Sequence, residues 1–143
     1  MNPITRTHAL IAWSITLGQC LQANENKSLI KYGTGLIAAC CAATRTFKQR
    51  LDRSKVRQIY KAYRVIEAQG WLDGVYDAES TISFVQAGLS DAMEASGNVE
   101  MVKALDEVNG WLDTIVLHLD PDLLKTQNFE LAGKKYRQFL EVV

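Results

Sequence analysis

The sequence predicts an all-α protein, a compact bundle of about five to six helices with no sheet. Apolar residues recur at steps of three and four along most of the chain, which is the period of a helix that buries one face. No stretch alternates apolar and polar residues for long, as a half-buried strand would. Apolar residues make up 48% of the 143 residues and charged residues 22%, which is typical of a globular chain. Because neither repeats nor a linker interrupt it, the chain is predicted to form a single helical domain over residues 1–143.

The first helix is predicted over about Thr5–Leu21. Its apolar side chains at helical steps are Leu10, Trp13, Leu17 and Leu21. The segment Thr7–Asn24 carries no formal charge, yet it contains too many polar groups for a membrane span. No transmembrane helix is therefore expected.

The second helix is predicted from Ser28, a suitable capping residue, to about Leu51. Its apolar stripe is expected to bury Leu36, Ile37 and Cys40. The opposite side carries small residues, which allow another backbone to approach closely. We expect this small-residue face to make a helix–helix contact through Gly35, Ala39 and Ala42. The second helix is therefore expected to pack on two sides.

The third helix is predicted from about Asp52 or Ser54 to Gln69, and one of its faces is basic. Four cations fall on this face at helical steps, and we call them the basic stripe: Arg53, Arg57, Lys61 and Arg64. A neighbouring apolar stripe contains Tyr60 and Tyr63. Apolar and aromatic residues bordered by cations are typical of a helix at an anionic membrane surface, where each cation contributes about 1 kcal/mol. The basic stripe and the two tyrosines are therefore the candidate interaction residues.

The rest of the chain is also predicted to be helical. The segment Trp71–Asp77 is expected to be a connection, and a fourth helix follows around Ile82–Met93. Asn98 is the expected cap of a fifth helix, whose apolar residues are in near-heptad order. Pro121 should end that helix, because proline cannot continue the hydrogen-bond ladder. A last helix is predicted over about Phe129–Val143.

The charges balance in total but are segregated along the chain. Sixteen basic residues balance sixteen acidic ones. Residues Arg45–Arg64 include eight basic residues and one acidic residue, whereas Val65–Asp122 includes twelve acidic residues and one basic residue. The basic stripe could be solvated or pair with the acidic half, or it could bind an anionic membrane surface or an acidic protein partner. Nucleic acid is the least favoured partner, because no reading motif accompanies the charge.

The residue types that carry enzyme or metal chemistry form no recognisable pattern. His8 and His118 are the two histidines, and neither has a cysteine or carboxylate at metal-ligand spacing. Cys40 and Cys41 are adjacent and lack the spacing of a redox pair. We therefore predict no catalytic residue, no metal ligand and no cofactor. Since two of the three cysteines are adjacent, no disulfide framework is expected, and an intracellular, reducing compartment fits better.

Two segments in the N-terminal half carry a paired pattern. Asn26–Ile37 reads NKSLIKYGTGLI, a polar start with lysine followed by aliphatic residues and Tyr-Gly, and Ser54–Ala68 reads SKVRQIYKAYRVIEA. Over residues 9–69 the chain resembles the peroxin-eleven family of peroxisomal membrane-elongation proteins. The second segment is similar to the basic amphipathic helix of that family. The resemblance implies a helical protein that inserts amphipathic helices into the peroxisomal membrane, oligomerises and promotes elongation before fission.

The sequence therefore predicts a non-catalytic helical interaction protein, with membrane-surface binding and remodelling of the peroxin-eleven type as its leading function. Its expected partners are an anionic membrane surface or a protein, and self-association is expected. On the membrane hypothesis it would be peripheral on an organelle membrane. The alternative is a soluble helical adaptor or accessory subunit of a larger assembly, a class that includes phage-type inhibitors of host proteins.

Overall fold

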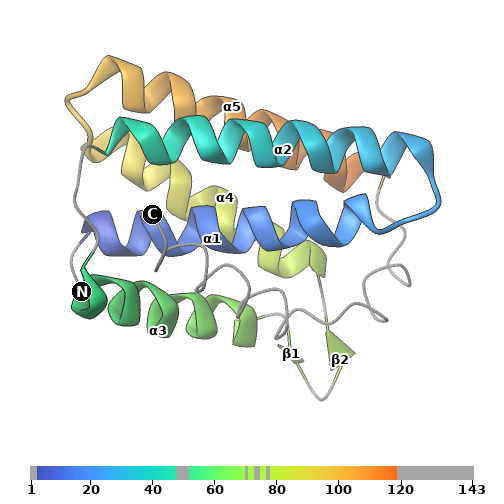
Figure 1. The fold of residues 1–143 in the computed structure, drawn as a ribbon, viewed down its shortest axis with the longest axis horizontal. Coiled ribbons are helices and arrows are strands. Elements are labelled where there is room, and N and C mark those ends of the chain that lie inside the picture. Colours follow the sequence, from blue (N-terminus) through green and yellow to red (C-terminus); the bar gives the residue numbers. More distant parts are fainter. Residues whose placement is uncertain (1–2, 48–51, 70, 73–74, 77, 119–143) are drawn as a thin grey trace.

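Five helices and one short pair of strands make up the described part of the structure. The computed structural model describes residues 3–47, 52–69, 71–72, 75–76 and 78–118 (Figure 1). In chain order the elements are α1 (Pro3–Gln22), α2 (Lys27–Thr46), α3 (Arg53–Gln69), β1 (Trp71–Leu72), β2 (Val75–Tyr76), α4 (Ala78–Ala95) and α5 (Val99–His118). This architecture confirms the predicted all-α class.

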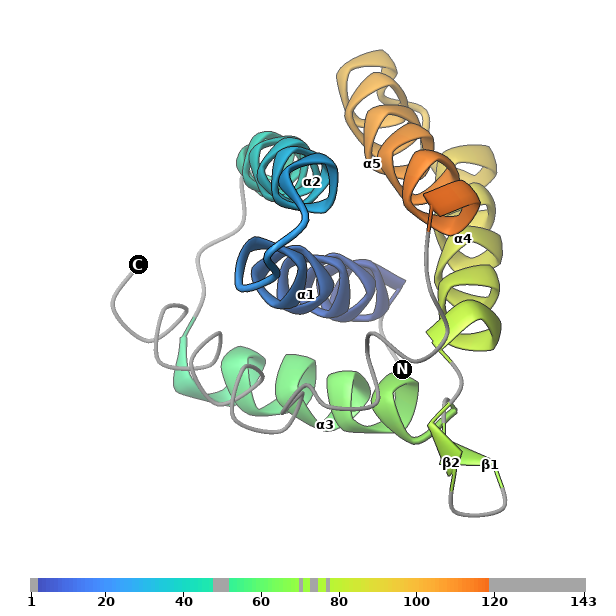
Figure 2. The same cartoon turned by 90° about the vertical axis from the view of Figure 1, so that its right-hand side faces the viewer.

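Helix α1 runs through the centre of the bundle, and α2, α3 and α4 pack around it (Figure 2). Fifteen of its twenty residues are buried. The sequence of α1 suits this position, because Arg6 is its only charged residue and the others are apolar or small and polar, apart from His8 and two glutamines. A helix without a polar face is stable only where it is enclosed. None of the described helices is both long enough and apolar enough to cross a bilayer.

Buried hydroxyl groups of α1 bind the backbone of the same helix. The Ser14 hydroxyl donates to the carbonyl oxygen of Leu10 at 2.9 Å. The Thr16 hydroxyl donates to the carbonyl oxygen of Ala12 at 3.0 Å. A buried hydroxyl without an acceptor would cost roughly 1–3 kcal/mol, so these bonds allow polar residues inside the bundle.

Helices α1 and α2 lie antiparallel and meet closely at two glycines (Figure 1). A Cβ atom on Gly33 would lie 2.6 Å from the carbonyl oxygen of Gly18 and 2.9 Å from the Cβ of Leu21. A Cβ atom on Gly18 would lie 2.9 Å from the carbonyl oxygen of Gly33. These separations are shorter than ordinary van der Waals contacts, so this crossing requires glycine at both positions.

The small-residue face of α2 packs on α5, in part as predicted. The indole of Trp111 lies directly over Gly35, where a Cβ atom would overlap the ring. Ala39, about one turn later, is buried. Ala42 is exposed, so its predicted helix–helix contact is wrong. Ala42 lies about two turns beyond Gly35 on almost the same side of α2, so the close contact with α5 at Gly35 does not extend to this end of the helix.

The apolar stripes of α2 and α3 are buried in the common core. In α2, Leu36 and Cys40 are buried as predicted, whereas Ile37 is only half-buried. The buried residues of α3 are Val56, Ile59, Ala62, Tyr63 and Ile66. Because α3 lies against α1 and α4, this stripe is covered by the protein itself.

Asparagine and aspartate side chains fix the starts of three helices by accepting hydrogen bonds from free backbone N–H groups. Asn26 Oδ1 accepts from the N–H of Ser28 at 2.9 Å, so Asn26 and not Ser28 is the cap of α2. The predicted Ser28 cap is therefore wrong. Asn98 caps α5 as predicted, accepting from the N–H of Glu100 at 2.9 Å. Asp52 accepts from a first-turn N–H of α3 at 2.9 Å.

The segment Trp71–Asp77, predicted to be a connection, contains a minimal antiparallel β pair. Its paired residues are Trp71 with Tyr76 and Leu72 with Val75. The sequence between the strands is Asp73-Gly74, a pair favoured in two-residue hairpin loops. With two residues a strand, the pair forms no layer and leaves the helical architecture unchanged.

The predicted bounds of α1 and α3 agree closely with those observed. The predicted end of the second helix at about Leu51 is wrong, because α2 ends at Thr46. The N–H of Phe47 donates to the carbonyl oxygen of Thr44, three residues back, which closes the last turn of the helix. The stop predicted at Pro121 and the last helix predicted over Phe129–Val143 lie outside the described residues.

Gly33→Ala should destabilise the fold, because the added methyl group meets backbone of α1 that cannot move aside. Overpacking of this kind costs about 1–3 kcal/mol. Gly110→Ala is the matched control, because no atom lies within 4 Å of a Cβ there and alanine favours a helix by about 1 kcal/mol. Urea unfolding followed by circular dichroism measures both variants. Equal stabilisation by both would show that α1 and α2 do not meet closely at Gly33.

Candidate interaction surface

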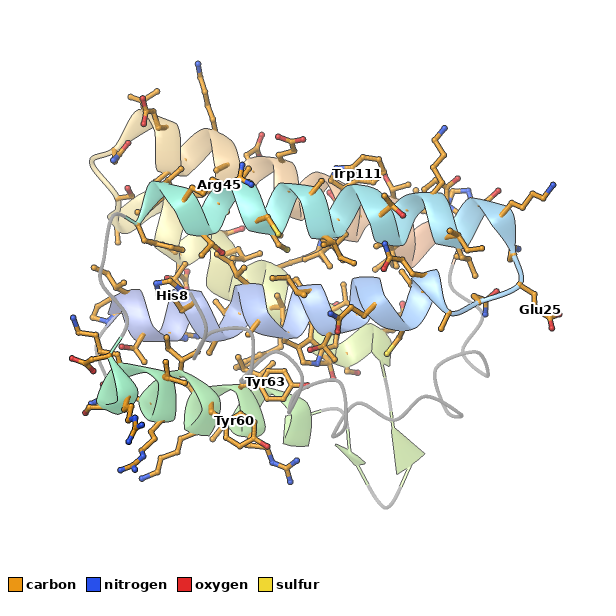
Figure 3. All side chains as sticks on the ribbon, viewed as in Figure 1. His8, Glu25, Arg45, Tyr60, Tyr63 and Trp111 are labelled. Atoms are coloured by element: carbon orange, nitrogen blue, oxygen red, sulfur yellow. The ribbon has the colours of Figure 1, made fainter. Side chains whose placement is uncertain are left out.

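The basic stripe occupies the outward face of α3. All four of its cations are exposed. At a rise of 1.5 Å per residue, the stripe extends about 16 Å along the helix from Arg53 to Arg64. Figure 3 shows the nitrogen-tipped side chains of α3 extending away from α1. The structure thus brings the four predicted cations together on one accessible face.

Three of the four cations of the stripe are not neutralised by the acidic half of the described chain. No described residue forms an ion pair or a side-chain hydrogen bond with Arg53, Arg57 or Lys61. Helix α5, which carries much of the acidic charge, lies on the other side of α1 (Figure 2). Within residues 3–47, 52–69 and 78–118, internal pairing of these three cations is therefore not observed.

The two tyrosines of α3 have different positions. Their rings stack with centroids 6.1 Å apart and an interplanar angle of 13°. Tyr63 is only 1% exposed, so its predicted contact with a membrane or partner is wrong. The reason is that Tyr63 belongs to the apolar stripe that packs into the core. Tyr60 is half-buried at the edge of that stripe and remains accessible.

A second charged surface lies on the outward face of α5. We call its four exposed carboxylates the acidic ridge: Glu100, Asp106, Glu107 and Asp113. Lys103 lies within the same face. Gln86 of α4 donates to Asp113 Oδ1 at 2.6 Å. The other three carboxylates have no side-chain hydrogen bond or ion pair to any described residue.

The sequence pattern indicated an excess of acidic residues, but it did not predict that four of them form one exposed surface on α5. Summing the charge over Val65–Asp122 combined residues of several elements and so hid how they are distributed. A helical projection of residues 99–118 would have placed the four carboxylates on one side of the helix.

Two of the three cysteines, Cys20 and Cys40, are poorly suited to nucleophilic or redox chemistry. Cys20 and Cys40 are buried, and Cys41 is half-buried. Burial raises the pKa of the Cys20 thiol to about 11. Burial, together with the neighbouring Cys41, raises the pKa of Cys40 well above its usual value. A thiol that stays protonated is a weak nucleophile.

Metal-binding residue types do not converge either. In the part of the chain that the structure describes, no three side chains of the His, Cys, Asp or Glu type are placed to hold a metal ion. The features left to interpret are two exposed charged surfaces of opposite sign.

Comparisons with known proteins leave these surfaces to be interpreted from their own geometry. No protein-family model, curated protein or solved structure matches the chain. The resemblance to the peroxin-eleven family therefore stays a prediction.

A buried histidine lies between α1 and α2 (Figure 3). The His8 side chain is 2% exposed, and its ring centroid lies 4.3 Å from that of Phe47. Neither ring nitrogen has a hydrogen-bond partner among the described residues. Burial lowers the pKa of His8 from 6.5 to about 4, so the imidazole is neutral at pH 7.

Acid should destabilise the fold through His8. His8 binds a proton near pH 6.5 in the unfolded chain but only near pH 4 in the folded protein. Above pH 6.5 His8 is neutral in both states, so its titration does not reduce the free energy of unfolding. As the pH falls from 6.5 towards 4, the free energy of unfolding decreases progressively, by roughly 3 kcal/mol in total. Unfolding by urea across this pH range measures the loss.

His8→Phe is the variant that isolates this effect, because phenylalanine does not titrate and can still pack on Phe47. The stability difference between His8→Phe and the parent should grow as the pH falls below 6.5. His118→Phe is the control, because His118 is exposed. A pH-independent difference for His8→Phe would show that His8 is not buried as described.

Proposed function

We propose that this protein is a non-catalytic helical adaptor that binds an acidic protein surface through the basic stripe of α3. The observation that supports this proposal is the division of α3 into two faces. Its apolar face packs into the core, while Arg53, Arg57 and Lys61 are exposed and have no ion-pair partner among the described residues. Cations gathered on one face attract an acidic surface, orient it and accelerate the encounter.

An anionic membrane surface is the second candidate partner. Each cation near such a surface contributes about 1 kcal/mol, and Tyr60 is accessible beside the basic stripe. Binding of this kind would be peripheral adsorption, because a helix that inserts needs a free apolar face. The apolar face of α3 is already covered.

Membrane remodelling of the peroxin-eleven type would require α3 to leave the core. Burial of a side chain such as Val56, Ile59 or Ile66 stabilises the fold by about 1.5–3 kcal/mol. Separation would also expose the apolar surface of α1. Lipid would cover the α3 side chains after insertion, so the uncompensated cost is the apolar surface of α1 that separation exposes, and the attraction of about 1 kcal/mol for each cation would have to offset it. The adaptor proposal requires no such rearrangement.

Arg57→Glu combined with Lys61→Glu should abolish binding to a fluorescent glutamate-rich peptide, which serves as a probe for acidic protein surfaces. The double change cancels the net charge of the basic stripe and places two anions at its centre. Fluorescence anisotropy at about 0.05 M salt measures binding, and about 0.5 M salt should weaken binding of the parent protein by screening. The melting temperature should change little, because exposed charges contribute little to stability.

Lys27→Glu combined with Lys31→Glu is the matched control. Both lysines are exposed on α2, and the change in net charge is the same, so peptide binding should persist. Co-sedimentation with phosphatidylserine vesicles tests the second candidate in the same variants. Binding to vesicles without binding to the peptide would favour the membrane surface. Peptide binding that survives in the Arg57→Glu, Lys61→Glu variant would contradict the adaptor proposal.

A further inference from the structure

We infer that the acidic ridge of α5 is the docking surface for the basic stripe of a second copy of this chain. This inference rests on the proposed function, because it names the acidic surface that the stripe binds. The ridge is exposed, and three of its carboxylates have no ion pair or side-chain hydrogen bond within the described residues. The stripe cations Arg53, Arg57 and Lys61 are also exposed and also have no ion pair or side-chain hydrogen bond within the described residues. Each surface therefore offers the counter-charge that the other lacks.

The two surfaces match in length and in form. The basic stripe extends about 16 Å along α3, and the acidic ridge from Glu100 to Asp113 extends about 20 Å along α5. Both are single faces of straight, exposed helices, so one helix can lie along the other without a change of backbone (Figure 1). Midway along the stripe are Arg57 and Lys61, and midway along the ridge are Asp106 and Glu107. Lys103 lies one turn from the latter pair, so the face of the ridge carries four carboxylates and one cation. The centres of the two surfaces therefore attract when copies meet.

The arrangement of the two surfaces determines the type of assembly. Helices α3 and α5 lie on opposite sides of α1 (Figure 2). A two-fold dimer that joins stripe to ridge twice would need both surfaces on the same side of the molecule. Contacts between different surfaces on opposite sides instead join copies head to tail, which produces rings or open chains.

The balanced charge of the whole chain favours this association. The formal net charge is zero at pH 7, so copies do not repel each other at long range. The attraction is local and directional, and it should weaken as salt shortens the screening length from about 10 Å at 0.1 M to about 3 Å at 1 M.

Sedimentation velocity with charge-reversed variants tests the inference. Parent protein at about 1 mM and about 0.05 M salt should form species larger than a monomer that dissociate at about 0.5 M salt. Arg57→Glu with Lys61→Glu, or Asp106→Lys with Glu107→Lys, should each raise the dissociation constant by about tenfold or more. Lys27→Glu with Lys31→Glu, the control on α2, should associate as the parent does.

The two reversed variants should restore association when mixed. In the mixture, the unchanged ridge of the first variant meets the unchanged stripe of the second, and the substituted pairs at the centres of the two altered surfaces are again opposite in charge. The variant that carries all four substitutions should also associate on its own. Circular dichroism confirms that each variant is folded. If one is not, Arg57→Gln with Lys61→Gln or Asp106→Asn with Glu107→Gln replaces it, and either should weaken association.

Three results would overturn the inference: a monomeric parent protein under these conditions, association that survives in both reversed variants, or no recovery in the mixture. The glutamate-rich peptide separates this failure from failure of the proposed function. Peptide binding that depends on Arg57 and Lys61, seen together with a monomeric parent protein, would mean that the acidic partner is a different protein. Loss of both properties would reject the adaptor proposal as well.

Discussion

The enclosure of α1 is the constraint on which the rest of the structure depends. This helix has no polar face to expose, so α2, α3 and α4 must each present an apolar face to it. The close crossing at Gly18 and Gly33 brings α2 against α1, and the hydroxyls of Ser14 and Thr16 are satisfied inside the helix. The surrounding helices are therefore arranged around α1 with their polar faces outward.

That arrangement separates the charges in space. Helix α3 covers one side of α1, and α5 lies on the other side, packed on α2 and α4 (Figure 2). Since the apolar face of each helix is buried, the basic stripe and the acidic ridge are left as opposite outer surfaces of the molecule. A chain with no net charge thereby acquires two charged surfaces of opposite sign.

The core position of α3 also changes the interpretation of its amphipathic pattern. An apolar stripe flanked by cations has the same sequence whether it covers a protein core or lies in a membrane. Tyr63 was a reasonable candidate for a membrane contact on pattern alone, and its burial shows that the stripe is already used. The cations are the part of the pattern that remains available to a partner.

The sequence by itself determined the helical class, the positions of most of the described helices and the grouping of the four cations on one face of α3. These properties depend on the helical period and on local capping, which neighbouring residues set. Only the tertiary structure decided which faces are covered. It separated Ala39, which is buried, from Ala42, which is exposed, and Tyr60 from Tyr63. It also placed the acidic ridge opposite the basic stripe, because the relative position of two helices depends on how both pack against α1, and no local pattern encodes that packing.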